Sequence, residues 1–163
     1  MKKLISFAFL AIFSLQAYAF DISGTGTVYK AVDGDTFWIS GIEDDVYEQL
    51  WAYSRDRDNF RHEYRSAKIR IGNVDTPESV HKNSALNTER GMSISEHMKD
   101  IAKGQRASFR CWTIGNHGRP ICAVSLDNIG DVGLYLIRNK FSPYVTRFGR
   151  HPYMHNAYAG AAQ

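Results

Sequence analysis

The chain has 163 residues, a length suited to one compact domain with a single core. Its 20 basic and 17 acidic side chains nearly balance, so a global positive field is no argument for a polyanionic partner. Beyond the N-terminal region no apolar run is long enough to span a bilayer, which excludes a membrane-spanning mature protein.

The first 19 residues follow the pattern of a secretory signal. Lys2 and Lys3 precede an apolar run at residues 4–15, and Ala19 ends a small-residue cleavage pattern. A run this short cannot cross a hydrocarbon core that needs about 20 helical residues. We therefore expect cleavage after Ala19 and a single mature domain, residues 20–163, in the periplasm or the medium. Loss of the two lysines lowers the formal net charge from +3 to +1.

β-Branched and aromatic residues predict five strands, of which the first two form a hairpin. Asp33-Gly34 separates this first pair and is a strong turn signal. In the third strand Ile69 and Ile71 share one face, so Arg70 points to the other. The expected strands lie, in chain order, at residues 26–32, 36–40, 67–73, 107–113 and 121–126.

Helical spacing of apolar residues appears between and after these strands. Residues 41–66 separate the second and third strands, and we interpret them as a helical insertion that could serve a protein partner. Two further helices are expected at residues 89–102 and 131–140. The pattern indicates a mainly β chain with helices (α+β), arranged as a five-stranded Greek-key barrel of the OB type with two or three helices. The open face of such barrels commonly binds nucleic acid.

The two cysteines, Cys111 and Cys122, fall in the fourth and fifth expected strands. A hairpin turning around Asn116-His117 would place them opposite each other. In an oxidising compartment they would form a disulfide, which stabilises a fold by about 3 kcal/mol for so short a loop and would fix the loop carrying Arg119. Two buried free thiols are the alternative.

Two acidic turns carry the candidate chemistry. Asp-Gly-Asp-Thr occupies residues 33–36, and Asp-Thr-Pro-Glu occupies residues 75–78, where the chain leaves the third strand. Carboxylates can hold a hard cation and handle water, and the guanidinium groups of Arg70 and Arg119 suit phosphate. Each piece taken alone has a structural reading as a turn or a surface charge. After residue 131, cations interleave with aromatic rings, as in a single-strand binding groove or a solvated helix face.

Together these motifs resemble the staphylococcal nuclease (thermonuclease) family of OB-fold nucleases. The matching pieces are residues 31–36, 69–78 and 118–119. The resemblance covers roughly residues 24–140 apart from the insertion. It implies an exported hydrolase, an endonuclease that cleaves DNA and RNA to 3′-phosphate ends and prefers single strands.

The resemblance also implies roles for individual residues. Calcium would be bound by Asp35, Asp75 and the backbone carbonyl of Thr76. Glu78 would orient or deprotonate the attacking water, and Arg70 and Arg119 would hold the scissile phosphate. The remaining substrate-binding candidates, which flank the place of the family's nucleotide pocket, are His117 and Tyr144.

Two other functions fit the same residues. One is a non-catalytic OB module that binds nucleic acid or protein and uses the insertion to hold a partner. The other is a phosphodiesterase for small nucleotides, favoured if the insertion closes the cleft.

Overall fold

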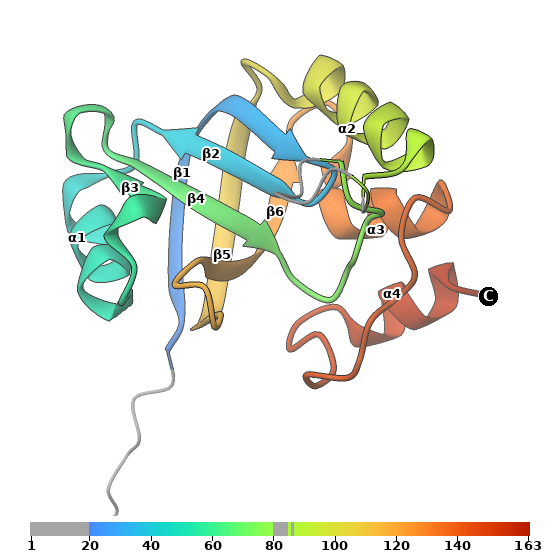
Figure 1. The fold of residues 1–163 in the computed structure, drawn as a ribbon. Helices are drawn as coiled ribbons and strands as arrows, with labels where there is room; N and C mark the ends of the chain where they lie inside the picture. The colour runs from blue at the N-terminus through green and yellow to red at the C-terminus, as the bar shows by residue number, and fades with distance from the viewer. Residues whose placement is uncertain (1–19, 80–84, 86) are drawn as a thin grey trace, which may run out of the picture.

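The computed structural model describes residues 20–79, 85 and 87–163 (Figure 1). The expected secretory signal at residues 1–19 lies outside this described part. Within it, no helix combines the length and the apolar character needed to cross a membrane.

Five strands close into a mixed barrel. They follow the order β4-β2-β1-β5-β6, and a parallel pairing of β4 with β6 closes the ring. The bounds are β1 (Ile22–Asp33), β2 (Thr36–Ser40), β4 (Ser66–Ile71), β5 (Arg106–Ile114) and β6 (Pro120–Leu126). Two short strands, β3 (Phe60–Arg61) and β7 (Gly130–Asp131), pair antiparallel with β4 and β6 respectively. The five-stranded OB-type barrel predicted from the sequence is thus confirmed.

Alternation along the strands produces the core. In β4, Ile69 and Ile71 are fully buried while Arg70 between them faces outward, as the period of two predicts. In β6, Val124 and Leu126 point inward in the same way. Burying each such aliphatic side chain stabilises the fold by roughly 1.5–3 kcal/mol, so the barrel interior dominates the stability.

Four α-helices occur in the described part of the chain: α1 (Asp44–Tyr53), α2 (Glu89–Ala102), α3 (Val132–Arg138) and α4 (His155–Ala161). The expected helix at residues 89–102 is confirmed, and the Thr88 hydroxyl caps it by accepting from the Gly91 amide at 2.9 Å. The sequence did not predict α4. Its Tyr158 is fully buried against Gly133 of α3, where a Cβ would lie 2.1 Å from the Tyr158 Oη.

The insertion is partly strand. After α1 the chain forms β3, which pairs with β4 through Phe60 opposite Ala67 and Arg61 opposite Ser66. The expected helical insertion at residues 41–66 thus also contains a short strand, which the sequence did not predict because a two-residue strand leaves no periodicity to detect. Figure 1 places the insertion at one end of β4, with α3 and α4 beyond the other end.

The predicted hairpin of β5 and β6 is confirmed with its disulfide. Cys111 pairs with Cys122 across the two strands, and the two residues are bridged. The turn closes through the Gly115 amide, which donates to the Arg119 carbonyl at 2.8 Å. The bridge thus joins the two strands below the turn that carries Arg119.

Candidate functional site

Three segments far apart in sequence meet at one edge of the barrel. Thr36 in β2 pairs with Arg70 in β4. Asp35, which directly precedes β2, therefore lies beside the outward-facing side chain of Arg70. Arg70 also pairs with Ile121 in the parallel strand β6. Arg119 precedes Ile121 by two residues and therefore lies near Arg70 at this edge. Strand pairing alone therefore brings one carboxylate and two guanidinium groups together.

The two acidic turns pack directly on each other. The Asp33 side chain accepts from the Asp35 amide at 3.2 Å, which shapes the tight turn. A Cβ at Gly34 would lie 2.8 Å from the Thr76 side chain, so only glycine permits this approach. The Thr76 amide also donates to Asp35 Oδ2 at 3.3 Å. The glycine of the first turn thus allows the second turn to sit against it.

Arg70 holds two carboxylates at once. Its Nη2 lies 3.1 Å from Asp35 Oδ2 and 2.8 Å from Asp75 Oδ1, and its Nη1 lies 3.2 Å from Asp35 Oδ1. The Thr36 hydroxyl adds a donor to Asp35 Oδ1 at 3.0 Å. Because both acids approach the same nitrogen, their oxygens converge on one small region.

Burial leaves Asp35 short of positive charge. The residue is 2% exposed, and burial raises the pKa of its carboxyl to about 7. The Arg70 charge opposes this rise, while the neighbouring Asp33 charge adds to it. Arg70 is shared with Asp75, whose Oδ2 also lies 3.5 Å from Arg147 Nη2. Because the Asp35 carboxyl is buried and shares its guanidinium partner with a second acid, a bound cation at this edge would favour its charged form.

Arg119 is half-buried beside Arg70. Its Nη1 donates to the Thr36 hydroxyl at 3.3 Å, and it forms no ion pair with another described residue. Burial, followed by the nearby charge of Arg70, lowers the pKa of the Arg119 guanidinium; the charges of Asp35, Asp33 and Glu78 oppose this. Two guanidinium groups this close, one without an acid partner, form a favourable place for a phosphate.

Glu78 lies at the rim of the site with its side chain exposed. Its carbonyl accepts from the Thr88 amide at 3.0 Å, at the start of α2. A Cβ at Gly91 would lie 2.2 Å from the Glu78 carbonyl oxygen, so the first turn of α2 packs on this backbone. The helix thus fixes the backbone that carries the carboxylate.

A C-terminal segment anchors the second acidic turn. Asn73, with φ of 60°, donates through Nδ2 to the carbonyls of Val145 at 2.7 Å and Gly149 at 2.8 Å. The Ser142 hydroxyl accepts from the Asp75 amide at 2.7 Å. Sequence reasoning missed these contacts, and the only signal near them was the mixture of cations and aromatic rings after residue 131.

The insertion braces the turn that carries Arg119. The Ser54 hydroxyl donates to the Gly118 carbonyl at 2.6 Å, and Asn59 Nδ2 donates to the His117 carbonyl at 2.8 Å. Both polar side chains are buried at 3% exposure. Sequence reasoning also missed this contact, because no local pattern links residues that are about 60 positions apart.

The side chains of the two substrate-binding candidates form none of the described contacts with these acids and arginines. His117 is exposed at the hairpin tip. The Tyr144 hydroxyl accepts from the His151 amide at 3.0 Å and lies 2.8 Å from His155 Nδ1, so its phenol belongs to the C-terminal cluster. The sequence-predicted residues that the fold brings together are Asp35, Arg70, Asp75, Thr76 and Arg119, with Glu78 at the rim.

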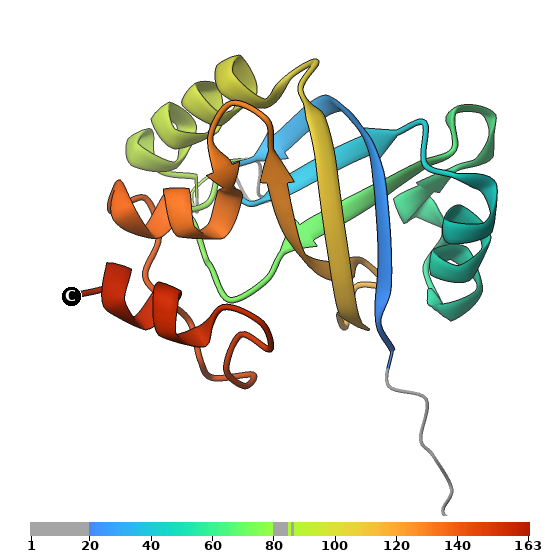
Figure 2. The same ribbon diagram turned by 180° about the vertical axis from the view of Figure 1, so that it is seen from behind.

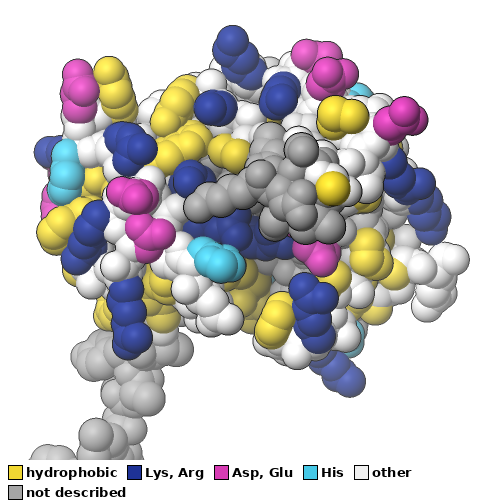
Figure 3. Space-filling model, in the orientation of Figure 1, with side chains coloured by type: hydrophobic (Ala, Val, Ile, Leu, Met, Phe, Trp, Pro, Cys, Tyr) yellow, Lys and Arg dark blue, Asp and Glu magenta, His cyan; other side chains and the backbone are white. Residues whose placement is uncertain are grey.

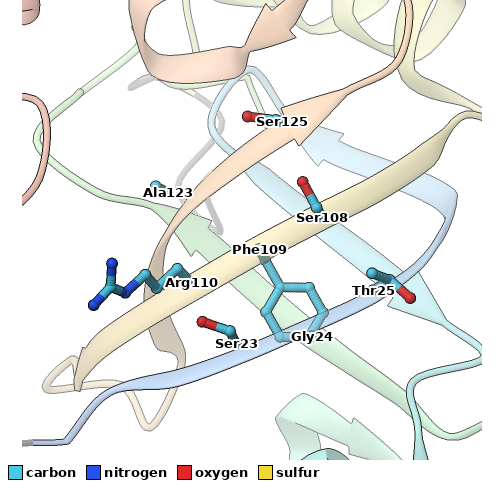
Figure 4. A pocket seen from close by; sticks show the side chains of 8 residues that line it. All are labelled: Ser23, Gly24, Thr25, Ser108, Phe109, Arg110, Ala123 and Ser125. Carbon is cyan, nitrogen blue, oxygen red and sulfur yellow. The ribbon is translucent and has the colours of Figure 1, made fainter.

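A hollow lies on the opposite side of the barrel from these residues. Figure 2 shows the outer face of β1 and β5, with α1 to one side and α3 and α4 to the other. A depression of about 480 Å³ there is lined by small residues together with Phe109 and Arg110 (Figure 4). Arg110 donates to both oxygens of Asp21, at 2.8 and 2.6 Å. This hollow therefore presents hydroxyl groups and a neutralised arginine, and it brings no acid cluster together.

The donor set of the first site suits a hard cation. Asp35 and Asp75 supply carboxylate oxygens that converge on Arg70 Nη2. Thr76, whose carbonyl is the third expected ligand, follows Asp75 directly, and its amide donates to Asp35 Oδ2. No group of three or more His, Cys, Asp or Glu side chains among the described residues is arranged to hold a metal ion. A cation here would need water or phosphate oxygens to complete its coordination.

No protein-family model and no curated protein matches this chain. The likeness to the thermonuclease family therefore rests on the two acidic turns and the two arginines. In the folded chain these motifs meet at one edge of a five-stranded barrel.

Proposed function

We propose that the protein is a calcium-dependent nuclease that hydrolyses phosphodiester bonds of DNA and RNA. The observation that carries the proposal is the convergence of Asp35, Asp75, Arg70 and Arg119 at one edge of the barrel. Acids that could hold a cation, beside two guanidinium groups of which Arg119 has no acid partner among the described residues, are the components that hydrolysis of a phosphate diester needs. The expected signal at residues 1–19 favours action outside the cytoplasm.

Asp35, Asp75 and the Thr76 carbonyl would hold the calcium ion. The raised pKa of Asp35 supports this, because a buried carboxylate that lacks enough positive charge gains most from a bound cation. When bound, the ion would supply Lewis-acid polarisation of the phosphate and neutralise the two acids.

The arginines bind and orient the diester. Arg119 has no acid partner among the described residues, so its forked donors are available for two phosphate oxygens. Arg70 is fixed by two carboxylates and presents its charge beside Arg119. Fixed cations of this kind stabilise the charge that accumulates on the phosphoryl oxygens in the transition state.

Glu78 would accept the proton of the attacking water. The water oxygen forms the new bond to phosphorus, the bond to the 5′ oxygen breaks, and that oxygen leaves with a proton from solvent, so the other product ends in 3′-phosphate. The Glu78 carboxylate is exposed and so has access to water, and its backbone is held in place by α2.

The test is cleavage of a labelled single-stranded oligonucleotide by the purified protein in calcium, magnesium or chelator. Glu78→Gln is compared with Glu48→Gln, a matched change on the exposed side of α1. We expect calcium-dependent cleavage to 3′-phosphate ends, a loss of about 10²–10⁴ in rate for Glu78→Gln and no change for Glu48→Gln. Wild-type protein that binds the oligonucleotide but leaves it intact in calcium would refute the proposal and identify a non-catalytic binding module.

A further inference from the structure

Beside the candidate site, two cations share one tryptophan ring. Arg61 Cζ lies 5.0 Å and Lys68 Nζ lies 5.3 Å from the centroid of Trp38. Trp38 pairs with Lys68 across β2 and β4, two residues along each strand from the pair formed by Thr36 and Arg70. The shared ring therefore adjoins the edge where the acids and arginines converge.

Neither cation has an acid partner in contact. Among the described residues, Lys68 and Arg61 form no ion pair, although Asp56 and Asp58 of the insertion lie near enough to act on Lys68. Burial, followed by the charge of Arg119, lowers the pKa of Lys68, and Arg61 contributes in the same direction. Lys68 is partly buried and Arg61 is exposed. Like charges that share one ring repel each other, and a bound anion relieves this repulsion.

The geometry of Arg61 is fixed. Its Nη1 donates to the Phe60 carbonyl at 2.8 Å and to the Asp58 carbonyl at 3.2 Å. These bonds hold the guanidinium above Trp38 without neutralising it, since backbone carbonyls carry no net charge. A cation that is held in place but not neutralised is arranged for an external partner.

The cations also lie in a row. Lys68 and Arg70 alternate with buried residues along β4, so their side chains leave the same face roughly 6.6 Å apart. That step is comparable to the separation of successive phosphates in an extended single strand. Figure 3 shows Lys and Arg side chains at the centre of this face and toward α1 and β3, with acidic side chains between some of them.

We propose that Lys68 and Arg61, held on Trp38, form a second phosphate subsite that binds the phosphate next to the one at Arg70 and Arg119. The inference rests on the proposed function and narrows its substrate class to strands with several phosphates. The strand would run along β4 toward β3, so the insertion would contribute to substrate binding through Arg61. A mononucleotide or an isolated diester would reach only the first subsite.

Binding is measured first, by fluorescence anisotropy of a labelled 12-nucleotide single strand in chelator, where no calcium-dependent cleavage occurs. We compare the wild type with Lys68→Gln, Arg61→Gln and the control Lys103→Gln, which lies at the exposed end of α2. Each subsite variant should weaken binding about 3- to 10-fold and reduce the slope of log K against log salt by about 0.7, and the control should do neither. Unchanged Tm values for the variants exclude misfolding.

Kinetics in calcium then separate the subsite from the proposed activity. For the 12-nucleotide strand, Lys68→Gln should raise KM several-fold with little change in kcat, while hydrolysis of bis(p-nitrophenyl) phosphate stays at the wild-type rate. Cleavage with wild-type KM and affinity in both variants would overturn the subsite and leave the nuclease proposal standing. If the wild type binds the strand, Lys68→Gln weakens this binding, and no cleavage occurs in calcium, then the nuclease proposal is overturned and the subsite is retained. Absence of both binding and cleavage in the wild type would overturn both.

Discussion

Arg110 and Arg119 lie on opposite sides of the same barrel and are used differently. Arg110 is exposed, donates to both oxygens of Asp21 and lies 3.8 Å from the centroid of the Tyr153 ring. Arg119 is half-buried, and among the described residues its side chain forms one hydrogen bond, to the Thr36 hydroxyl at 3.3 Å. Partial burial without an acid partner is costly for a cation, so the fold tolerates it where a ligand can supply the missing charge. The difference favours Arg119 over Arg110 as the arginine for the proposed phosphate.

The largest expected effect separates the two arginines directly. Arg119→Ala should lower the rate of oligonucleotide cleavage about 10³-fold, because the developing charge on the phosphate loses a fixed donor. Arg110→Ala should leave the rate within about twofold, since its charge is already neutralised by Asp21. Single-turnover kinetics on both variants check this. Equal losses of cleavage rate in the two variants would show that the ion pair with an acid does not decide which arginine contributes.

Asp35 at the candidate site and Asp21 beside Arg110 allow a second comparison, of the stability gained from calcium. Calcium at 100 times its Kd should raise the free energy of unfolding of the wild type by about 2.7 kcal/mol. Asp35→Asn should abolish this gain because a buried ligand oxygen is lost, whereas Asp21→Asn should retain it. Thermal unfolding with calcium and with chelator measures the difference. A full calcium response in Asp35→Asn would place the ion elsewhere.

The brace from the insertion gives a smaller expected effect. Asn59→Ala removes the donor to the His117 carbonyl and should lower kcat about 3- to 10-fold through the position of Arg119. Asn128→Ala, which removes a similar bond to the Ile101 carbonyl far from the site, should not. In an Arg119→Ala background, Asn59→Ala should cause no further loss. Additive losses in the double variant would show that Asn59 does not act through Arg119.

The smallest expected effect concerns His151, whose ring packs against the rings of Trp112 and Tyr158. Its Nδ1 accepts from the amides of Tyr153 at 3.2 Å and Met154 at 3.0 Å, and burial lowers its pKa against the weaker opposing charge of Asp131. Because the folded-state pKa lies below the unfolded value near 6.5, His151 favours the folded state fully above that pH. The contribution is lost as pH falls through the folded-state pKa.

His151→Asn keeps a side-chain acceptor but cannot titrate. The difference in Tm between wild type and variant should therefore shrink by a few degrees between pH 8 and pH 5. Thermal unfolding across this range measures it. A difference that stays constant with pH would mean that His151 does not change its protonation on unfolding.

The barrel was predictable because its signals are local. Alternation around Ile69 and Ile71 predicted an outward Arg70, and the Asp33-Gly34 turn predicted the first hairpin, as the structure shows. The pairing of Cys111 with Cys122 followed from two strands and one turn. Each of these features depends on residues within about a dozen positions of one another.

The contacts that support the site were not predictable in this way. Asn73 reaches Val145, and Asn59 reaches His117, across 72 and 58 positions of sequence. Helix α4 has seven residues, including Gly160, and depends on the packing of Tyr158 rather than on local propensity. Polar contacts between distant loops leave no periodic pattern, so they emerge only from the folded chain.

The parallel pairing of β4 with β6 also bears on when the chain acquires its chemistry. Asp35 and Arg70 lie at the paired strands β2 and β4, which the insertion separates in sequence, whereas Arg119 joins them only when a loop of about 50 residues between β4 and β6 has closed. Closing so long a loop carries an entropic penalty and tends to come late in folding. A nascent or partly unfolded chain would thus hold its acids without the second arginine and remain inert. Recovery of cleavage during refolding should coincide with ring closure rather than with formation of the first hairpin.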